Sequence, residues 1–90
     1  MSEPDAEREV LRALVEVTGE PVRAFLRKAT PLEDACVDSL ALLEIVNILQ
    51  GRLGIVVPDE VTARIRTVAD LHQAVADLVT AGSLSTRTRS

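Results

Sequence analysis

The spacing of apolar residues predicts two long amphipathic helices in the first part of the chain. The first begins near Pro4, a residue suited to a first helical turn because its missing N–H needs no partner there, and it ends at Gly19. Its apolar positions recur at intervals of three and four: Ala6, Val10, Leu11, Leu14 and Val17. The second extends from about Ser39 to Arg52 and ends near Gly51 and Gly54, and we expect it to be the central helix. Its apolar stripe consists of Leu42, Ile45, Val46, Leu49 and Leu53.

The rest of the chain is predicted to contain one short helix and one longer helix. Pro58-Asp59-Glu60 opens the short helix, with proline and acids where a helix N-terminus favours them. It ends by Arg66. Thr67-Val68-Ala69-Asp70 has the form of a capping box and starts the last helix, which Gly82 closes. The apolar face of this helix consists of Val68, Leu71, Val75, Leu78 and Val79. Ile55-Val56-Val57 has no second strand-like run to pair with, so we interpret it as an extended connector on the core.

The connection between the first two helices has a weaker pattern, which Pro21 and Pro31 interrupt. Residues 21–28 are expected to contain a short helical turn. The residues of this connection best suited to pack inward are Val22, Phe25, Leu26 and Leu32. A connection of about twenty residues is long for so small a domain, and such loops are usually functional or disordered. The regular spacing of the apolar anchors favours an ordered loop.

Length and composition restrict the fold to one small all-α domain. A chain of 90 residues supports a single core, and Phe25 is its only aromatic residue, so that core consists of aliphatic side chains. We therefore predict a four-helix bundle over residues 1–82, with a short third helix and a long loop between helices 1 and 2. A disordered tail over residues 83–90 is expected to follow. The lone Cys36 excludes an internal disulfide framework. No segment resembles a signal peptide or a membrane span, so a cytoplasmic location is expected.

The predicted domain is acidic. The net charge of the chain is −4, and residues 1–82 contain 14 acidic and 8 basic residues. Residues 29–51 contain Glu33, Asp34, Asp38 and Glu44 but no lysine or arginine. Acidic surfaces repel phosphate backbones and anionic lipids, so neither nucleic acid nor membrane is an expected partner. The charge instead favours protein partners with basic faces.

The sequence contains no catalytic constellation. His72 is the only histidine, and it falls on the polar side of the last helix, where we expect a solvated surface residue. Cys36 has no second thiol or nearby histidine and is interpreted as a half-buried loop residue. A glycine-rich phosphate loop, a cluster of metal ligands and a basic nucleic-acid patch are also missing from the sequence. We therefore predict that the protein is not an enzyme, and that any chemistry is done to it by others.

Three segments resemble the corresponding parts of an acyl carrier protein. They are residues 31–40, which end in Asp38-Ser39-Leu40, and residues 53–60 and 67–71. The triplet alone is a weak signal, but its position at a helix start and the two further segments extend the resemblance over nearly all of residues 5–82. The resemblance implies that Ser39 receives 4′-phosphopantetheine from coenzyme A through a separate magnesium-dependent transferase. The arm then holds acyl intermediates as thioesters for enzymes of polyketide, fatty-acid or related biosynthesis.

The resemblance also implies roles for the residues around Ser39. Asp38 orients the site or the metal of the transferase. A recognition face for partner enzymes is formed by Leu40, Leu43, Glu44, Asn47, Asp59 and Glu60. The implied partners are a phosphopantetheinyl transferase and acyl-loading, condensing or tailoring enzymes with basic docking faces. The carrier itself is expected to be a monomer.

The chain departs from the family pattern in two places, and two alternatives stay open. Ala35-Cys36-Val37 stands where many members have Leu-Gly before the triplet, so the loop lacks a flexible glycine. The second helix has a single acid, Glu44, and has Asn47 where an apolar residue is expected. These departures favour a carrier dedicated to one biosynthetic cluster at least as much as a general fatty-acid carrier. The alternatives are a peptidyl or aminoacyl carrier, and a helical interaction domain without a prosthetic group in which Asp38 is simply an N-cap. A DNA-binding helix-turn-helix would need a basic recognition helix, which the sequence lacks.

Overall fold

A computed structural model describes the backbone of residues 3–89 and the side chains of residues 5–81. Its helical segments are α1 (Glu3–Thr18), η1 (Val22–Phe25), η2 (Leu32–Ala35), α2 (Ser39–Leu53), α3 (Asp59–Thr62) and α4 (Val68–Arg89). The two η segments are short 3-10 helices. Within the described backbone there is no strand, and one isolated antiparallel bridge joins Pro31 to Thr67. The predicted all-α fold with a short third helix is therefore confirmed.

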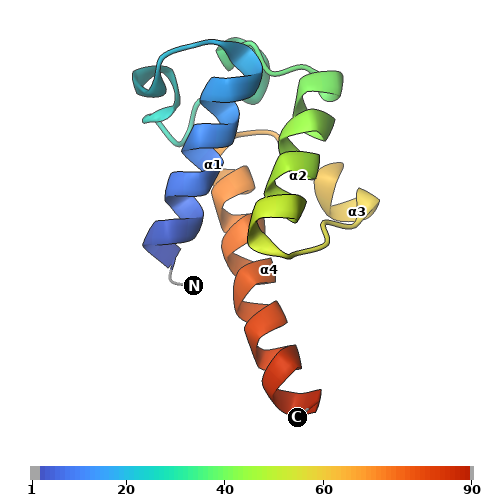
Figure 1. The fold of residues 1–90 in the computed structure, drawn as a ribbon. Helices are drawn as coiled ribbons and strands as arrows, with labels where there is room; N and C mark the ends of the chain where they lie inside the picture. Colours follow the sequence, from blue (N-terminus) through green and yellow to red (C-terminus); the bar gives the residue numbers. More distant parts are fainter. Residues whose placement is uncertain (1–2, 90) are drawn as a thin grey trace.

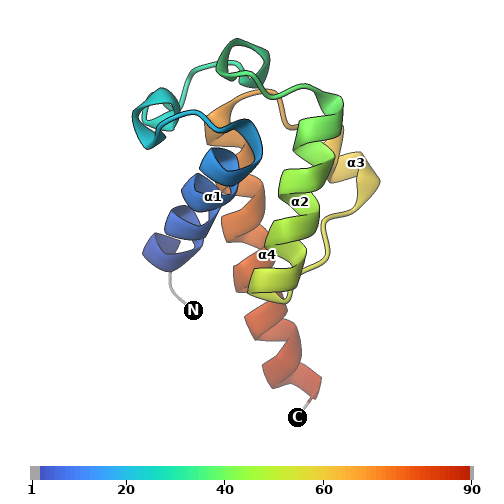
Figure 2. The same cartoon turned by 45° about the horizontal axis from the view of Figure 1, so that its top comes forward.

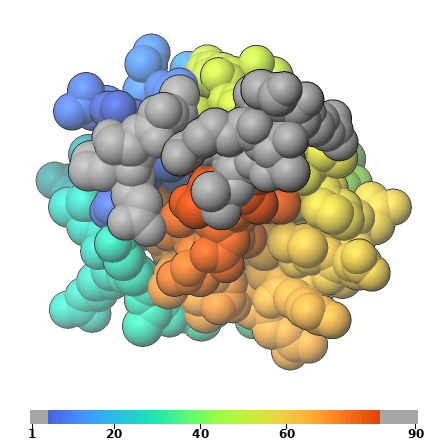
Figure 3. All heavy atoms as spheres, turned by 90° about the horizontal axis from the view of Figure 1, so that it is seen from below, coloured from blue at the N-terminus to red at the C-terminus, as the bar shows by residue number. Residues whose placement is uncertain are grey.

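The bundle is formed by α1, α2 and α4, which Figures 1 and 2 show packed together, with α3 beside α2. Seen from below (Figure 3), α4 in orange lies between the first connection in turquoise and the segment around α3 in yellow. The largest fully buried side chains come from α1, η1, α2 and α4: Val10, Leu14, Phe25, Ile45, Leu49, Val68, Leu71 and Val75. Burying each such side chain contributes roughly 1.5–3 kcal/mol before the entropy of ordering the chain is counted. The predicted apolar faces therefore form the core.

Two glycines end α1 and α2, as the sequence predicts. Gly19 has a φ of 75°, and its amide donates to the carbonyl of Val15 at 2.9 Å. Gly54 has a φ of 66°, and its amide donates to the carbonyl of Gln50 at 3.0 Å. Left-handed backbone of this kind carries a steric penalty for any residue with a Cβ, so glycine stops both helices at low cost.

The long connection between α1 and α2 is ordered, as predicted, and crosses the end of the bundle at which α2 begins (Figure 2). Backbone hydrogen bonds tie it to the residue pair before α4 and to the first residues of α4: Leu32 N–H to Arg66 at 2.9 Å, Val68 N–H to Thr30 at 3.2 Å and Ala69 N–H to Lys28 at 2.7 Å. These bonds satisfy polar groups that an irregular segment would otherwise leave unpaired.

The inward anchors of this connection differ in part from the prediction. Phe25 and Leu32 are buried, but Val22 and Leu26 are 47% and 60% exposed, so the prediction was wrong for these two. The short helix η1 packs against α1 and buries a single residue, Phe25. Ala35 and Val37 are buried in their place.

The connector after α2 and the capping of α4 agree with the prediction, whereas the end of α4 does not. Ile55 and Val57 are buried, and Val56 between them points outward. The amide of Asp70 donates to the hydroxyl of Thr67 at 3.1 Å, and the amide of Thr67 donates to the carboxylate of Asp70 at 3.2 Å, which is the predicted capping box. Helix α4 continues through position 82 to Arg89, because a single glycine costs a helix only about 1 kcal/mol. The side chains from residue 82 onward lie outside the described residues, so the disorder expected for residues 83–90 stays a prediction.

Candidate functional site

Ser39 is the first residue of α2 and is exposed at the end of the bundle. Asp38 precedes it as the N-cap, and its side chain accepts a hydrogen bond from the amide of Ala41 at 2.8 Å. The carbonyl of Asp38 accepts from the amide of Leu42 at 2.9 Å. Such a cap fixes the start of the helix. The hydroxyl of Ser39 therefore lies at a helix N-terminus, where the partial positive charge is about half a unit.

The loop that enters the site is held by one residue in an unusual conformation. Cys36 has φ 64° and ψ 27°, which is left-handed backbone, and within the described chain it is the only residue other than glycine with a positive φ. This conformation costs a residue with a Cβ about 1–2 kcal/mol. The next residue, Val37, is buried, and its amide donates to the carbonyl of Leu32 at 2.9 Å. The loop thus makes its turn at Cys36 without a glycine.

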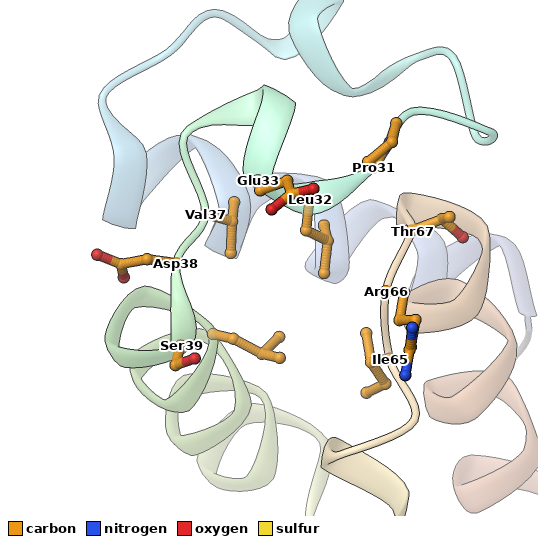
Figure 4. A pocket seen from close by; sticks show the side chains of 10 residues that line it. Pro31, Leu32, Glu33, Val37, Asp38, Ser39, Ile65, Arg66 and Thr67 are labelled. Carbon is orange, nitrogen blue, oxygen red and sulfur yellow. The ribbon is translucent and has the colours of Figure 1, made fainter.

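Ser39 opens onto a cleft of about 650 Å³ between α2, η2 and the segment before α4. The residues that line it are Pro31, Leu32, Glu33, Val37, Asp38, Ser39, Leu42, Ile65, Arg66 and Thr67. Figure 4 shows Ser39 on one wall of this cleft, with Ile65, Arg66 and Thr67 on the opposite wall. Its lining combines apolar side chains, such as Leu42 and Ile65, with polar ones, such as Arg66 and Thr67, which suits an amphipathic guest.

A second, smaller cleft of about 350 Å³ reaches Ser39 from the side of α3. It shares Leu42 and Ile65 with the first cleft, so these two side chains stand between the two spaces. Leu43 of α2 and Asp59 of α3 also line it. A group attached to Ser39 therefore has room on both sides of its attachment point.

Nothing in the described structure activates Ser39 as a nucleophile. Neither cleft is lined by a histidine or a lysine, and no hydrogen bond to the Ser39 hydroxyl is formed by the described side chains. Residues 5–81 also contain no group of three acidic, histidine or cysteine side chains able to hold a metal ion. A serine without a base or metal of its own suits a role as the acceptor in a reaction that another enzyme catalyses.

The residues predicted to form the recognition face are all exposed. Leu40 and Leu43 are 67% and 49% exposed, and Glu44 and Asn47 lie on the same outer side of α2. Asp59 and Glu60 are exposed at the start of α3, and Asp59 adjoins Leu43 at the smaller cleft. The sequence reasoning missed Val56, whose position between two buried residues already indicated an outward side chain. It also missed Arg66, because only the tertiary fold brings this residue to the cleft of Ser39.

The lone cysteine and the lone histidine both differ from the prediction. Cys36 is exposed and not half-buried, and its thiol donates to the carboxylate of Glu20 at 3.5 Å. This hydrogen bond and the negative charge of Glu20 raise the pKa of the thiol. His72 is not a solvated residue: both ring nitrogens are buried without a hydrogen-bond partner, and this burial lowers the pKa of the imidazole. The connection between α1 and α2 covers the side of α4 that was predicted to be polar and solvated. The carbonyl of Lys28 in this connection accepts from the amide of Ala69 in α4.

Comparison with known proteins connects this geometry to a family. A family model described as "Phosphopantetheine attachment site" matches residues 8–75. The acetyl form of the actinorhodin acyl carrier protein from Streptomyces coelicolor is 32% identical with a TM-score of 0.69, over 83% of this chain and 91% of that one. No curated protein sequence matches the chain significantly.

Two further solved structures come from the actinorhodin polyketide synthase of Streptomyces coelicolor. Its hexanoyl carrier is 31% identical with a TM-score of 0.70, over 79% of this chain and 86% of that one. Its carrier with a 3-oxo-butyl intermediate mimic is 31% identical with a TM-score of 0.66, over 89% of this chain and 92% of that one. Family model and structural neighbours thus agree with the resemblance of the three sequence segments. The chain belongs to the acyl carrier proteins, the family of domains to which phosphopantetheine is attached.

Proposed function

We propose that Ser39 carries 4′-phosphopantetheine and that the protein delivers the acyl groups held there to enzymes of a polyketide-type pathway. The observation that carries this proposal is the position of Ser39, exposed at the first turn of α2 behind its N-cap and at the mouth of a cleft of about 650 Å³. The position also lies within the residues that match the family model. The structural neighbours from a polyketide synthase support the choice of pathway.

The residues around Ser39 fit the group. Its phosphodiester is anionic, and a helix N-terminus offers unpaired N–H groups and a favourable dipole for an anion. The apolar lining of the cleft, with Leu32, Val37, Leu42 and Ile65, suits an acyl chain. When attached, the group supplies a flexible arm with a terminal thiol on which acyl groups are held as thioesters. The chain itself anchors this arm at one fixed point, which raises the effective concentration of its cargo at a docked enzyme.

Attachment makes Ser39 the acceptor in a phosphoryl transfer. The Ser39 oxygen attacks the phosphorus that bears the pantetheine part of coenzyme A, and a new O–P bond forms. The pyrophosphate P–O bond breaks, 3′,5′-ADP leaves, and the hydroxyl proton goes to a base of the transferase. Asp38 uses one carboxylate oxygen to accept from Ala41, while its other oxygen has no partner within the described residues. That free oxygen is available to the transferase or to its magnesium ion.

The surface around Ser39 supports docking of enzymes with basic faces. Glu44, Asp59 and Glu60 are exposed, as are the apolar Leu40 and Leu43, and Asp59 lines the smaller cleft together with Leu43. Exposed charge pairs contribute only about 0.2–1 kcal/mol each, so such contacts speed encounter and still release the carrier for its next partner. Within the described residues no helix is long and apolar enough to cross a membrane. As part of the proposal, the protein is a monomeric, cytoplasmic carrier without catalytic activity of its own.

Intact mass measurement tests the attachment. After incubation with coenzyme A and a broad-specificity phosphopantetheinyl transferase, we expect one adduct of phosphopantetheine mass on the wild type and none on Ser39→Ala. Ser83→Ala is the matched control and should carry the adduct. Circular dichroism should show that Ser39→Ala retains its helices. An unchanged wild-type mass, or an adduct on Ser39→Ala, would contradict the proposal, and the first outcome would favour an interaction domain without a prosthetic group.

A further inference from the structure

Among the described residues that line the main cleft of Ser39, Arg66 is the only cationic one. Figure 4 shows it on the wall opposite Ser39, together with Ile65. Three ion pairs join described side chains elsewhere on the surface, and they use Arg12, Lys28 and Arg52. The guanidinium of Arg66 takes part in none of them, and no hydrogen bond within the described residues occupies it, although Glu33 lines the same cleft. Its donors are therefore available to a guest.

The backbone of Arg66 is fixed although its side chain is free. Its amide donates to the carboxylate of Asp70 at 3.1 Å, and its carbonyl accepts from the amide of Leu32 at 2.9 Å. The bridge between Pro31 and Thr67 holds the next residue in place. The base of the side chain is thus held between the long connection and the cap of α4, so little backbone entropy is lost when the guanidinium engages a ligand.

The geometry determines whether the phosphodiester oxygens or the oxygens of the acyl group can reach this guanidinium. A phosphodiester on Ser39 is bonded directly to the hydroxyl oxygen and remains at the wall of α2. Only a group further along the arm can cross the cleft, which Leu42 and Ile65 help to line, to the wall of Arg66. A guanidinium is a planar group of hydrogen-bond donors that binds carboxylate and carbonyl oxygens. A saturated chain has no acceptor for these donors. An acyl chain that carries an oxygen matches both the apolar side chains of the cleft and the free donors of Arg66.

We propose that Arg66 determines acyl specificity in this carrier: its guanidinium donates hydrogen bonds to a keto or carboxylate oxygen of the acyl group that lies in the cleft. The cleft therefore holds oxygenated chains in preference to saturated chains of equal length. This inference rests on the proposed attachment to Ser39. Arg66 acts on the cargo and leaves the attachment reaction itself unchanged.

The test compares the wild type with Arg66→Gln, which removes the guanidinium, and with Arg64→Gln, which removes a nearby exposed arginine that does not line the cleft. Each protein is loaded with a butyl or a 3-oxobutyl pantetheine analogue whose stable thioether replaces the thioester. Intact mass confirms loading before any other measurement. Nitrogen–proton NMR then follows the side chain of Arg66, and nuclear Overhauser contacts to Leu42 and Ile65 report how much of the chain lies in the cleft.

In the wild type, the 3-oxobutyl group should shift the Arg66 signal relative to the butyl group and contact both methyl-bearing side chains. Arg66→Gln should reduce the fraction of 3-oxobutyl chain in the cleft roughly two- to fivefold, the modest effect of a hydrogen bond from an exposed charge, while Arg64→Gln behaves as the wild type. Equal Arg66 signals in the two loaded forms would overturn the inference. So would a signal that changes with the bare arm and is then insensitive to the acyl group, because that result places the phosphodiester at Arg66. Failure of loading appears in the mass and counts against Ser39 instead.

Discussion

At the scale of single residues, Cys36 adopts the left-handed backbone that glycine usually adopts, in the loop before Ser39. Its φ of 64° is strained for any residue with a Cβ, yet the buried Val37 and the N-cap Asp38 follow directly and fix the course of the chain. We predict that Cys36→Gly stabilises the protein by up to about 1 kcal/mol, because the steric cost of left-handed backbone disappears. Urea unfolding at neutral pH measures the change.

Cys36→Ala is the control for this prediction, because it removes the thiol and its hydrogen bond to Glu20 but keeps the Cβ. If the glycine variant is no more stable than the alanine variant, the left-handed backbone at this position does not destabilise the protein, and the prediction is wrong. The sequence could not predict this conformation, since nothing in a cysteine indicates a positive φ. It could predict Ser39 and Asp38, because an N-cap beside an apolar stripe is a local signal.

At the scale of elements, α4 meets α1 and the long connection around His72. Glu7 and Lys28 form an ion pair at 3.1 Å and line a hollow of about 290 Å³ with this histidine. Burial lowers the pKa of His72 from its ordinary value of 6.5, so the unfolded chain binds a proton more readily than the folded one. We predict that the free energy of unfolding is fully present above pH 6.5 and falls as the pH drops below it. Urea unfolding from neutral pH to pH 5, roughly the lower end of histidine titration, measures the loss.

His72→Gln provides the comparison, because it keeps a polar side chain of similar size and cannot titrate. Its stability should be flat across that pH range, and a wild type that is equally flat would contradict the prediction. Glu7 does not confuse the result: its hydrogen bond to Lys28 lowers the pKa of the carboxyl from 4.5, so its contribution is lost only at more acidic pH. The burial of His72 could not be predicted from helical periodicity. Periodicity indicates the apolar and polar faces of α4, but it carries no information on the loop that covers the polar face.

The same distinction explains which elements the sequence predicts well. Helix starts and stops at Gly19, Asp38 and Thr67 depend on neighbours in the sequence, and the structure confirms them. The exposure of Val22 and Leu26, in contrast, depends on which residue of η1 packs inward in the tertiary fold, and the prediction was wrong there. Arg66 reaches the cleft of Ser39 only because backbone hydrogen bonds join two segments that are far apart in the chain.

At the scale of the whole molecule, the net charge of −4 acts through its distribution more than through its sum. Glu44 is exposed on the outer side of α2, beside the apolar Leu40 and Leu43, whereas Asp77 is exposed on α4. Reversing either charge changes the net charge equally, so a comparison of the two isolates the effect of position. We predict that Glu44→Lys raises the KM of a phosphopantetheinyl transferase for this carrier roughly two- to tenfold, the effect of losing and reversing one exposed contact.

Asp77→Lys should leave that KM within about twofold of the wild type, because screening limits the reach of an exposed charge to about 8–10 Å in physiological salt. Steady-state kinetics at low and high salt measures both variants, and the penalty of Glu44→Lys should shrink as salt rises. Circular dichroism should be unchanged, since Glu44 makes no hydrogen bond or ion pair within the described residues. An equal increase in KM for the two variants would mean that the transferase responds only to the net charge. That result would contradict a recognition face on α2.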